Sequence, residues 1–217
     1  MTDNQRETRE KILDTAEELF AREGFGAVSL RKIISEAGVN LASVHYYFGS
    51  KEGLVEAIVG RLVVPVHEER ARRLAEMREK FGEDGGGIEN VVRAFIEPVF
   101  YFRSGSGRDG KFVAKLMGRL MTEYGEEMWQ RMSKIFQPTV QMFGEAMKRL
   151  WPDVALDRIF MGMHFMVGTM AHTVGSADFL AEGQCMQFDR PLTQEQIIDD
   201  LVIYISGGIK ALTGESR

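Results

Sequence analysis

The sequence is poor in the features that stabilise secreted proteins or place a chain in a membrane. Its single cysteine, Cys185, excludes an intrachain disulfide and any zinc site built from several cysteines. No apolar run approaches the roughly 18 residues that a membrane-spanning helix requires. The N-terminal residues are polar and lack the apolar stretch of a signal peptide. We therefore expect a cytoplasmic protein with no membrane partner.

The alternation of apolar and polar residues that marks a half-buried strand is rare, and the 217 residues include only five prolines. Apolar residues instead recur at helical spacing, in a composition of 44% hydrophobic and 27% charged residues that is typical of globular proteins. The sequence predicts an all-α fold of about nine helices. They cover residues 6–22, 30–36, 41–47, 51–81, 88–103, 111–124, 126–150, 156–180 and 194–212.

Side chains that cap helices mark several of these boundaries. Ser29 and Asn40 precede two short helices, and Thr193 with Gln196 forms a capping box before the last one. Pro65 is expected to kink or interrupt the fourth helix, whose second half is rich in Glu and Arg and is expected to be exposed. The first 55 residues contain three short helices joined by tight turns, which is a helix-turn-helix layout. We divide the chain into a helix-turn-helix head at 1–55 and a helical body at 56–217.

An excess of positive charge is also missing. The net charge is −5, and the first 54 residues hold seven Lys and Arg against nine Asp and Glu. Binding to nucleic acid must therefore depend on where individual donors lie. The third short helix carries Tyr46 and Tyr47, whose hydroxyls suit contacts with phosphate. As alternatives, one tyrosine packs against the first helix, and Lys51 or Arg31 is merely solvated.

The segment from Val28 to Leu54, VSLRKIISEAGVNLASVHYYFGSKEGL, resembles the DNA-binding head of the TetR family of bacterial regulators. The resemblance covers about residues 8–58. It implies a homodimer of nine-helix subunits that binds palindromic, double-stranded operator DNA. It also implies a variable body whose small effector controls release from the operator.

The same resemblance assigns roles within the head. It implies that Arg31 reaches a base, that the front of the recognition helix touches base edges, and that Tyr47 and Lys51 hold phosphates. His45 departs from the family pattern, which usually has tyrosine there. We expect the DNA-contacting residues to be Ser29, Arg31, Leu41, Ala42, Ser43, His45, Tyr46, Tyr47 and Lys51.

The body is rich in methionine, since eleven of the thirteen methionines lie between Met117 and Met186. Such residues form ordinary core or an adaptable surface around an apolar ligand. Residues 115–123 and 158–168 loosely resemble the fatty-acid-responsive sub-branch of the family, which implies a long-chain acyl ligand, free or as its coenzyme A thioester. We expect a small apolar effector, with Arg119 and His164 at its headgroup unless these are a surface arginine and a core histidine. The expected effector-binding residues are Met117, Arg119, Met121, Met163, His164, Phe165 and Met166.

The last two long helices are expected to build the dimer through a wide apolar face. The alternative is that this helix pair is buried within one subunit. The expected interface residues are Ile198, Leu201, Val202, Ile205, Ile209 and Leu212.

Catalytic signals are weak. Gly105–Lys111 has the glycine and lysine spacing of a phosphate-binding loop, but Phe112 replaces the Ser or Thr that would bind magnesium, and no strand precedes it. His164 and His172 are eight residues apart, too far for a shared metal without further ligands. We expect a regulator with no cofactor and no metal. The alternatives are a helical interaction scaffold without DNA binding and, with the least support, an enzyme.

Overall fold

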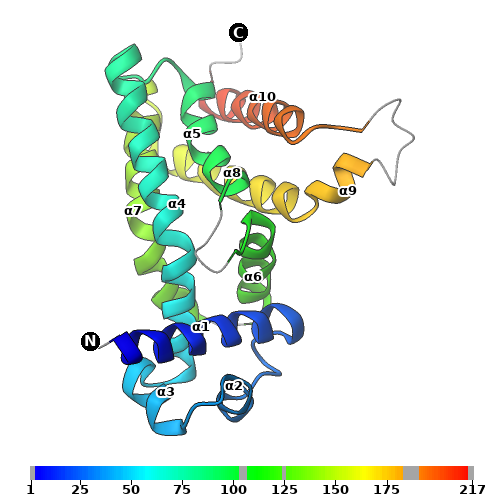
Figure 1. The fold of residues 1–217 in the computed structure, drawn as a ribbon. Helices are drawn as coiled ribbons and strands as arrows, with labels where there is room; N and C mark the ends of the chain where they lie inside the picture. The colour runs from blue at the N-terminus through cyan, green and yellow to red at the C-terminus, as the bar shows by residue number, and fades with distance from the viewer. Residues whose placement is uncertain (1–2, 103–106, 124–125, 183–190, 215–217) are drawn as a thin grey trace. The chain divides into compact units, whose positions relative to one another are not determined.

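The computed structural model describes residues 3–102, 107–123, 126–182 and 191–214, and within these ranges the chain forms ten α-helices and no strand (Figure 1). This confirms the all-α class. The short α9 brings the total to ten, and the remaining helices match the predicted ones in order. The helices are α1 (Asp3–Glu23), α2 (Leu30–Ala37), α3 (Leu41–Phe48), α4 (Lys51–Phe81), α5 (Ile88–Phe100), α6 (Gly110–Glu123), α7 (Glu126–Leu150), α8 (Leu156–Gly175), α9 (Ala177–Glu182) and α10 (Gln194–Thr213).

The described residues group into two compact units. The first, which we call the head unit, contains residues 1–65, 104–107 and 115–136, and the second, the body unit, contains 66–103, 108–114 and 137–217. The head unit therefore includes most of α6 and the first part of α7, as well as α1–α3 and the first part of α4. None of the helices in the described ranges combines the length and apolar character needed to span a bilayer.

The head unit has its own apolar core. α1 contributes Leu19 and Phe20 to it, and Phe20 stacks on Phe25 of the following turn with ring centroids 4.7 Å apart. α1 packs against α2 and α3, which are also in contact with each other. Ile33 of α2 and Val44 of α3 are fully buried against this core. Burial of these side chains fixes both short helices on α1, since each helix is too short to be stable alone.

In the body unit, α10 packs against α5 and α8. Phe95 of α5 meets Phe143 of α7 edge to face, with ring centroids 4.8 Å apart. The second half of α4 was predicted to be exposed, and this was wrong for one of its faces. Val66, Arg70 and Leu74, spaced four residues apart, are all buried. α4 also continues through Pro65 without interruption.

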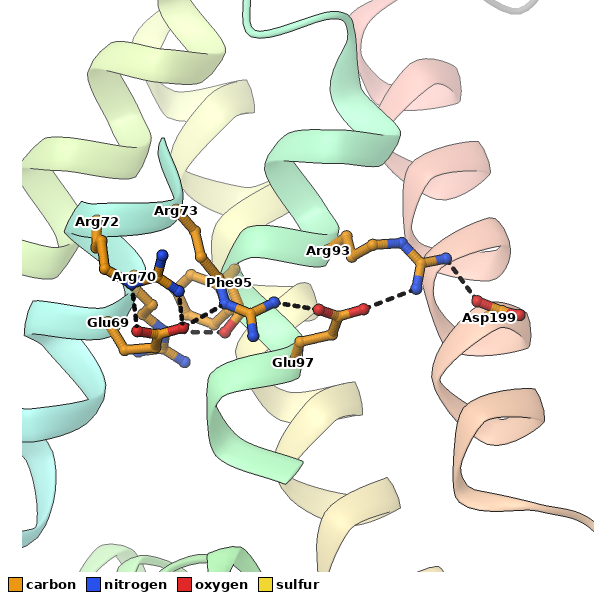
Figure 2. Close-up of polar contacts among 8 residues, drawn as sticks. All are labelled: Glu69, Arg70, Arg72, Arg73, Arg93, Phe95, Glu97 and Asp199. Carbon is orange, nitrogen blue, oxygen red and sulfur yellow. Dashed lines mark hydrogen bonds and ion pairs between the residues drawn. The ribbon is translucent and has the colours of Figure 1, made fainter. Parts of the chain in front are cut away.

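Charged side chains link α4, α5 and α10 across the surface of the body unit (Figure 2). Arg73 pairs with Glu69 at 2.7 Å and also with Glu97 of α5. Glu97 accepts from Arg93 at 2.9 Å, and Arg93 reaches Asp199 of α10 at 2.6 Å. These pairs link α4 to α5 and α5 to α10, and α5 and α10 also pack against each other.

Candidate functional site

The turn between α2 and α3 is built by capping residues. The Ser29 hydroxyl accepts from the amide of Lys32 at the start of α2, and the Asn40 carboxamide accepts from the amide of Ser43 at 2.8 Å at the start of α3. Gly38 ends α2 with a φ of 61°, a left-handed conformation that favours glycine. These local bonds fix the angle at which α3 leaves α2, and they confirm the predicted caps.

One face of α3 anchors the helix and the other is open to solvent. Val44 is fully buried, whereas Leu41 is 50% exposed and Tyr46 is 73% exposed. Ala42 and His45 are exposed as well. An apolar and aromatic surface on a short helix is unusual for a solvated face. Its shape and size suit insertion into the major groove of B-DNA, which admits one α-helix.

The charge of this region differs from that of the head as a whole. From Gly24 to Ser50 the only acidic residue is Glu36. Much of the negative charge of the head lies on α1, where Arg61 of α4 binds Glu10, Asp14 and Glu17 at 2.9 Å or less. The segment that contains α2 and α3 is thus less negative than the net charge of the head indicates.

The other predicted DNA contacts are placed as follows. Arg31 is exposed on the first turn of α2, so its guanidinium can reach outward. The Ser43 hydroxyl donates to the Asn40 carboxamide at 3.0 Å and is therefore engaged in the cap. Tyr47 is half-buried, and its ring meets that of Tyr46 edge to face at 5.0 Å. Tyr47 is thus the tyrosine that packs, while Tyr46 projects into solvent.

His45 makes a specific hydrogen bond at the end of α3. Its Nδ1 lies 2.7 Å from the carbonyl oxygen of Gly49. A carbonyl oxygen only accepts, so Nδ1 carries the proton and donates. In the neutral ring, Nε2 is then an acceptor and has no proton to offer to a phosphate. The geometry explains why histidine here is not equivalent to the tyrosine of the family pattern.

Lys51 points toward the interior of the head unit. Its ammonium donates to the carbonyl of Phe25 and lies 5.9 Å from the ring centroid of Phe20. Burial lowers the pKa of Lys51. A lysine that binds phosphate extends its ammonium into solvent, and Lys51 does not do so here. Two of its three ammonium protons are not used by the bond to Phe25. The phosphate contact of Lys51 stays a prediction.

The residues predicted to bind an effector do not share one environment. Met163 and Met166 are buried on the inner face of α8, whereas His164 and the half-exposed Phe165 lie on its outer face. Met117 and Arg119 are half-buried on α6, where Arg119 pairs with Glu123 at 3.9 Å. The side chain of Met121 is outside the described residues. The buried methionines remain candidates for ligand contact, while the placement of His164 and Phe165 favours a surface role.

The residues predicted to form the dimer interface are core residues of the subunit. Five of them are 1–6% exposed and lie on the face of α10 that packs against α5 and α8, and Leu212 beside them is half-buried. A side chain already enclosed by its own chain cannot form the contact with a second copy, which corrects the assignment of this face to an interface. The five are Ile198, Leu201, Val202, Ile205 and Ile209.

The opposite faces of α8 and α10 carry an exposed apolar surface that the sequence reading missed. Phe160 and Phe165 of α8 are 58% and 52% exposed, and Ile203 and Tyr204 of α10 are 68% and 71% exposed. We call these four residues the α8/α10 face. The signal in the sequence was the presence of these large apolar and aromatic residues in addition to the apolar stripe that each helix buries.

The head is a helix-turn-helix with an exposed second helix, which is the architecture of a class of DNA-binding regulators. The family described as "Bacterial regulatory proteins, tetR family" matches residues 12–58, and the family described as "Tetracyclin repressor-like, C-terminal domain" matches residues 93–208. Together they cover both parts of the chain. The chain belongs to the tetR family of bacterial regulatory proteins.

Individual relatives agree with this assignment. The chain is 32% identical over 72 residues to the regulator UidR of Escherichia coli (strain K12), a match that covers 33% of each protein. It is 42% identical over 126 residues to the regulatory protein RaaS of Mycobacterium tuberculosis, covering 54% of this chain and 53% of RaaS. These matches thus span a third to a half of the relatives' lengths. SmeT, the repressor of a Stenotrophomonas maltophilia multidrug efflux pump, has a similar fold, with a TM-score of 0.60, 18% identity and coverage of 94% and 88%.

Proposed function

We propose that this protein is a cytoplasmic transcription repressor that binds a palindromic operator as a homodimer and is released from it by a small apolar effector. The observation that carries the proposal is the surface of α3. Leu41, Ala42 and Tyr46 are exposed while Val44 anchors the helix on the core. Apolar side chains at the front of a recognition helix suit contact with thymine methyl groups. The exposed Arg31 on α2 supplies a group that can pair with guanine.

We infer that two copies meet through the α8/α10 face. Large exposed apolar surfaces on a water-soluble domain mark interaction sites. Gly168 lies beside this face on α8, and Gly207 and Gly208 lie beside it on α10. A methyl group added at any of the three would touch nothing within 4 Å. Helices of a second copy can therefore approach the backbone closely here. The two-fold symmetry of such a pair would match the two half-sites of a palindrome.

The effector is expected in the body unit, which carries a cluster of buried methionines on α8. Met163, Met166 and Met170 are 8% exposed or less. Thioether side chains adapt to the shape of an apolar ligand. A long-chain fatty acid or its coenzyme A thioester is the finer form of this proposal. The effector would act by binding better to the arrangement of the dimer that does not fit DNA.

Selection of operator sequences tests this function. Purified protein is used to enrich duplexes from a random pool, and the expected product is a two-fold symmetric site. Arg31→Ala is expected to lose selectivity at one base pair of each half-site, at a cost of about 1–3 kcal/mol. Arg22→Ala, which removes an exposed arginine paired with Glu23, serves as the control and should select the same site. Enrichment of no sequence by the wild-type protein would favour the alternative of a scaffold without DNA binding.

A further inference from the structure

Arg70 of α4 is a charged side chain in the interior of the body unit, with 5% of its surface exposed. Its Nε donates to the carbonyl oxygen of Phe95 at 2.8 Å, and its guanidinium lies 3.7 Å from the centroid of the Phe95 ring. The terminal Nη2 faces the thioether sulfur of Met170 at 3.7 Å. All three partners are neutral, and the thioether is a weak acceptor.

Neighbouring arginines of α4 and α5 differ from Arg70 in their partners. Arg72, Arg73 and Arg93 each pair with one or more carboxylates, although all three are more exposed than Arg70 (Figure 2). Within the described part of the chain, no carboxylate pairs with Arg70. The fold thus supplies negative charge at the surface, where an ion pair contributes little. At the buried guanidinium of Arg70, where an unpaired cation is costly, the described residues supply no carboxylate.

The charge of Arg70 persists in this environment. Burial lowers the pKa of its guanidinium to about 9, which still leaves the cation at neutral pH. Buried charges in proteins are normally paired. A carboxylate is the group that best completes such a site, because its two oxygens match two N–H donors of a guanidinium in a planar, bidentate pair.

The surroundings of Arg70 specify the remainder of the ligand. Phe95 and Phe143 present aromatic rings at this point, and Met170 comes from α8. His67 lies one turn before Arg70 on α4, and its Nδ1 is 2.9 Å from the hydroxyl of Thr139 on α7. Met170 has the weakest contact with the guanidinium and a flexible side chain, so it is the group a ligand would displace.

From these contacts we propose that Arg70 is the anion-binding residue of the effector site, and that the effector is a carboxylate on an apolar body. The inference rests on the proposed function, in which the body unit binds an apolar effector, and gives that effector a charge. It replaces Arg119 and His164 as headgroup partners, and it separates the two forms considered above. A free fatty acid carries the carboxylate, whereas its coenzyme A thioester does not.

The test measures binding to the protein alone, by calorimetry and without DNA. The probes are octanoate, dodecanoate and hexadecanoate, each compared with the primary alcohol of the same chain length. We expect at least one carboxylate to bind, and its alcohol to bind about tenfold more weakly or worse. In Arg70→Met the carboxylate should fall to the affinity of the alcohol, while Arg70→Lys should retain part of the preference. Arg72→Met, which removes an exposed and paired arginine, should bind like wild type.

Equal binding of acid and alcohol to the wild-type protein would overturn the proposal, as would failure of every probe to bind. A preference for the acid that survives in Arg70→Met would do the same. If Arg70→Met does not fold, the acid and alcohol series on the wild type and on Arg70→Lys decides the matter. Operator binding is measured separately on the same preparations. Intact operator binding with no carboxylate preference defeats this inference alone, whereas absence of operator binding defeats the proposed function.

Discussion

The Nε of Arg61 donates a 2.9 Å hydrogen bond to the carboxylate of Glu17, a side chain with no exposed surface. The same guanidinium binds Glu10 at 2.9 Å and Asp14 at 2.8 Å. Because the three acids follow one face of α1, a single arginine of α4 holds that helix along about two turns. α1, against which α2 and α3 pack, is thereby tied to α4 through a carboxylate that is buried from water.

Arg61→Met should destabilise the head unit strongly, because it leaves the Glu17 carboxylate buried without its cation. The expected loss is about 3–5 kcal/mol in the free energy of unfolding, measured by chemical denaturation. The double variant with Glu17→Met should recover much of the loss, since it removes both charges. Arg131→Met, which breaks the exposed pairs with Glu56 and Glu127, should cost no more than about 1 kcal/mol. Equal stability of the two single variants would show that the clamp contributes little.

His45→Tyr should strengthen DNA binding. The Nδ1 proton of His45 is used by the Gly49 carbonyl, so the neutral ring turns an acceptor toward any phosphate. A phenol can donate, and one such bond is worth about 1 kcal/mol, or roughly fivefold in affinity. Fluorescence anisotropy on the selected operator, in mildly alkaline buffer, measures the difference. His45→Phe keeps a ring but no donor and should match wild type; if it binds as well as His45→Tyr, packing rather than donation explains the gain.

Charges placed on the α8/α10 face should dissociate the dimer. Ile203→Glu combined with Tyr204→Glu introduces two carboxylates where we infer that a second copy packs, while the native fold of the subunit leaves both positions exposed. Sedimentation should report a folded monomer with reduced operator affinity. Tyr101→Glu replaces another exposed aromatic, 55% exposed at the end of α5, and should remain dimeric. A dimeric double variant would move the interface to another surface.

Stability of the body unit should fall in acid partly through Glu69. Hydrogen bonds from Arg72, opposed by burial and reinforced by Arg73, lower the pKa of Glu69 from 4.5 to about 2. The folded state therefore binds this proton less readily than the unfolded state. The resulting stabilisation is complete above pH 4.5 and is lost as the pH falls toward 2. Since the side chain is about one-third exposed, we expect no more than about 1 kcal/mol.

Comparison of Glu69→Gln with Glu68→Gln isolates this effect. Thermal unfolding between neutral pH and about pH 2 should show a shallower decline for Glu69→Gln than for wild type. Glu68 is its exposed neighbour and should leave the profile unchanged. Identical slopes for all three proteins would mean that solvent already screens the Glu69 pairs.

The boundaries of the helices were largely readable from the sequence because capping is local. Thr193 and Gln196 form the expected reciprocal cap on α10, and Asn40 caps α3 as predicted. Each cap involves residues only three positions apart, so no knowledge of tertiary contacts was needed. Where tertiary contacts decide, the sequence was less informative.

The two sides of α10 show why. Ile205 and Tyr204 are neighbours on a helix that is apolar on both sides, and the sequence does not state which side faces the helix's own subunit. Packing against α5 and α8 buries Ile205 and leaves Tyr204 outside. A helix that is apolar on two sides therefore predicts two packing partners, but it does not indicate which side packs within its own subunit.

Two charged residues show a related effect. Arg70 lies in the second half of α4, which was expected to be exposed, yet it is buried, and Lys51 was expected to hold a phosphate. Long side chains, however, reach acceptors that are distant in the sequence, and Lys51 finds the carbonyl of Phe25. For Arg70 the sequence did contain a signal. Arg70 lies four residues after Val66 and four before Leu74, so it shares a helix face with two apolar residues, and all three are buried.

The division of α3 into an anchored and a free side also bears on how this regulator can change over evolutionary time. Val44 alone is fully buried, whereas Leu41, Ala42 and Tyr46 are exposed. Substitutions at the three exposed positions leave the core of the head intact, so under the proposed function they would alter the DNA sequence that is read with little loss of stability. A duplicated copy of the gene could thus acquire a new target by a few changes on one helix. The scaffold that presents that helix would be inherited unaltered.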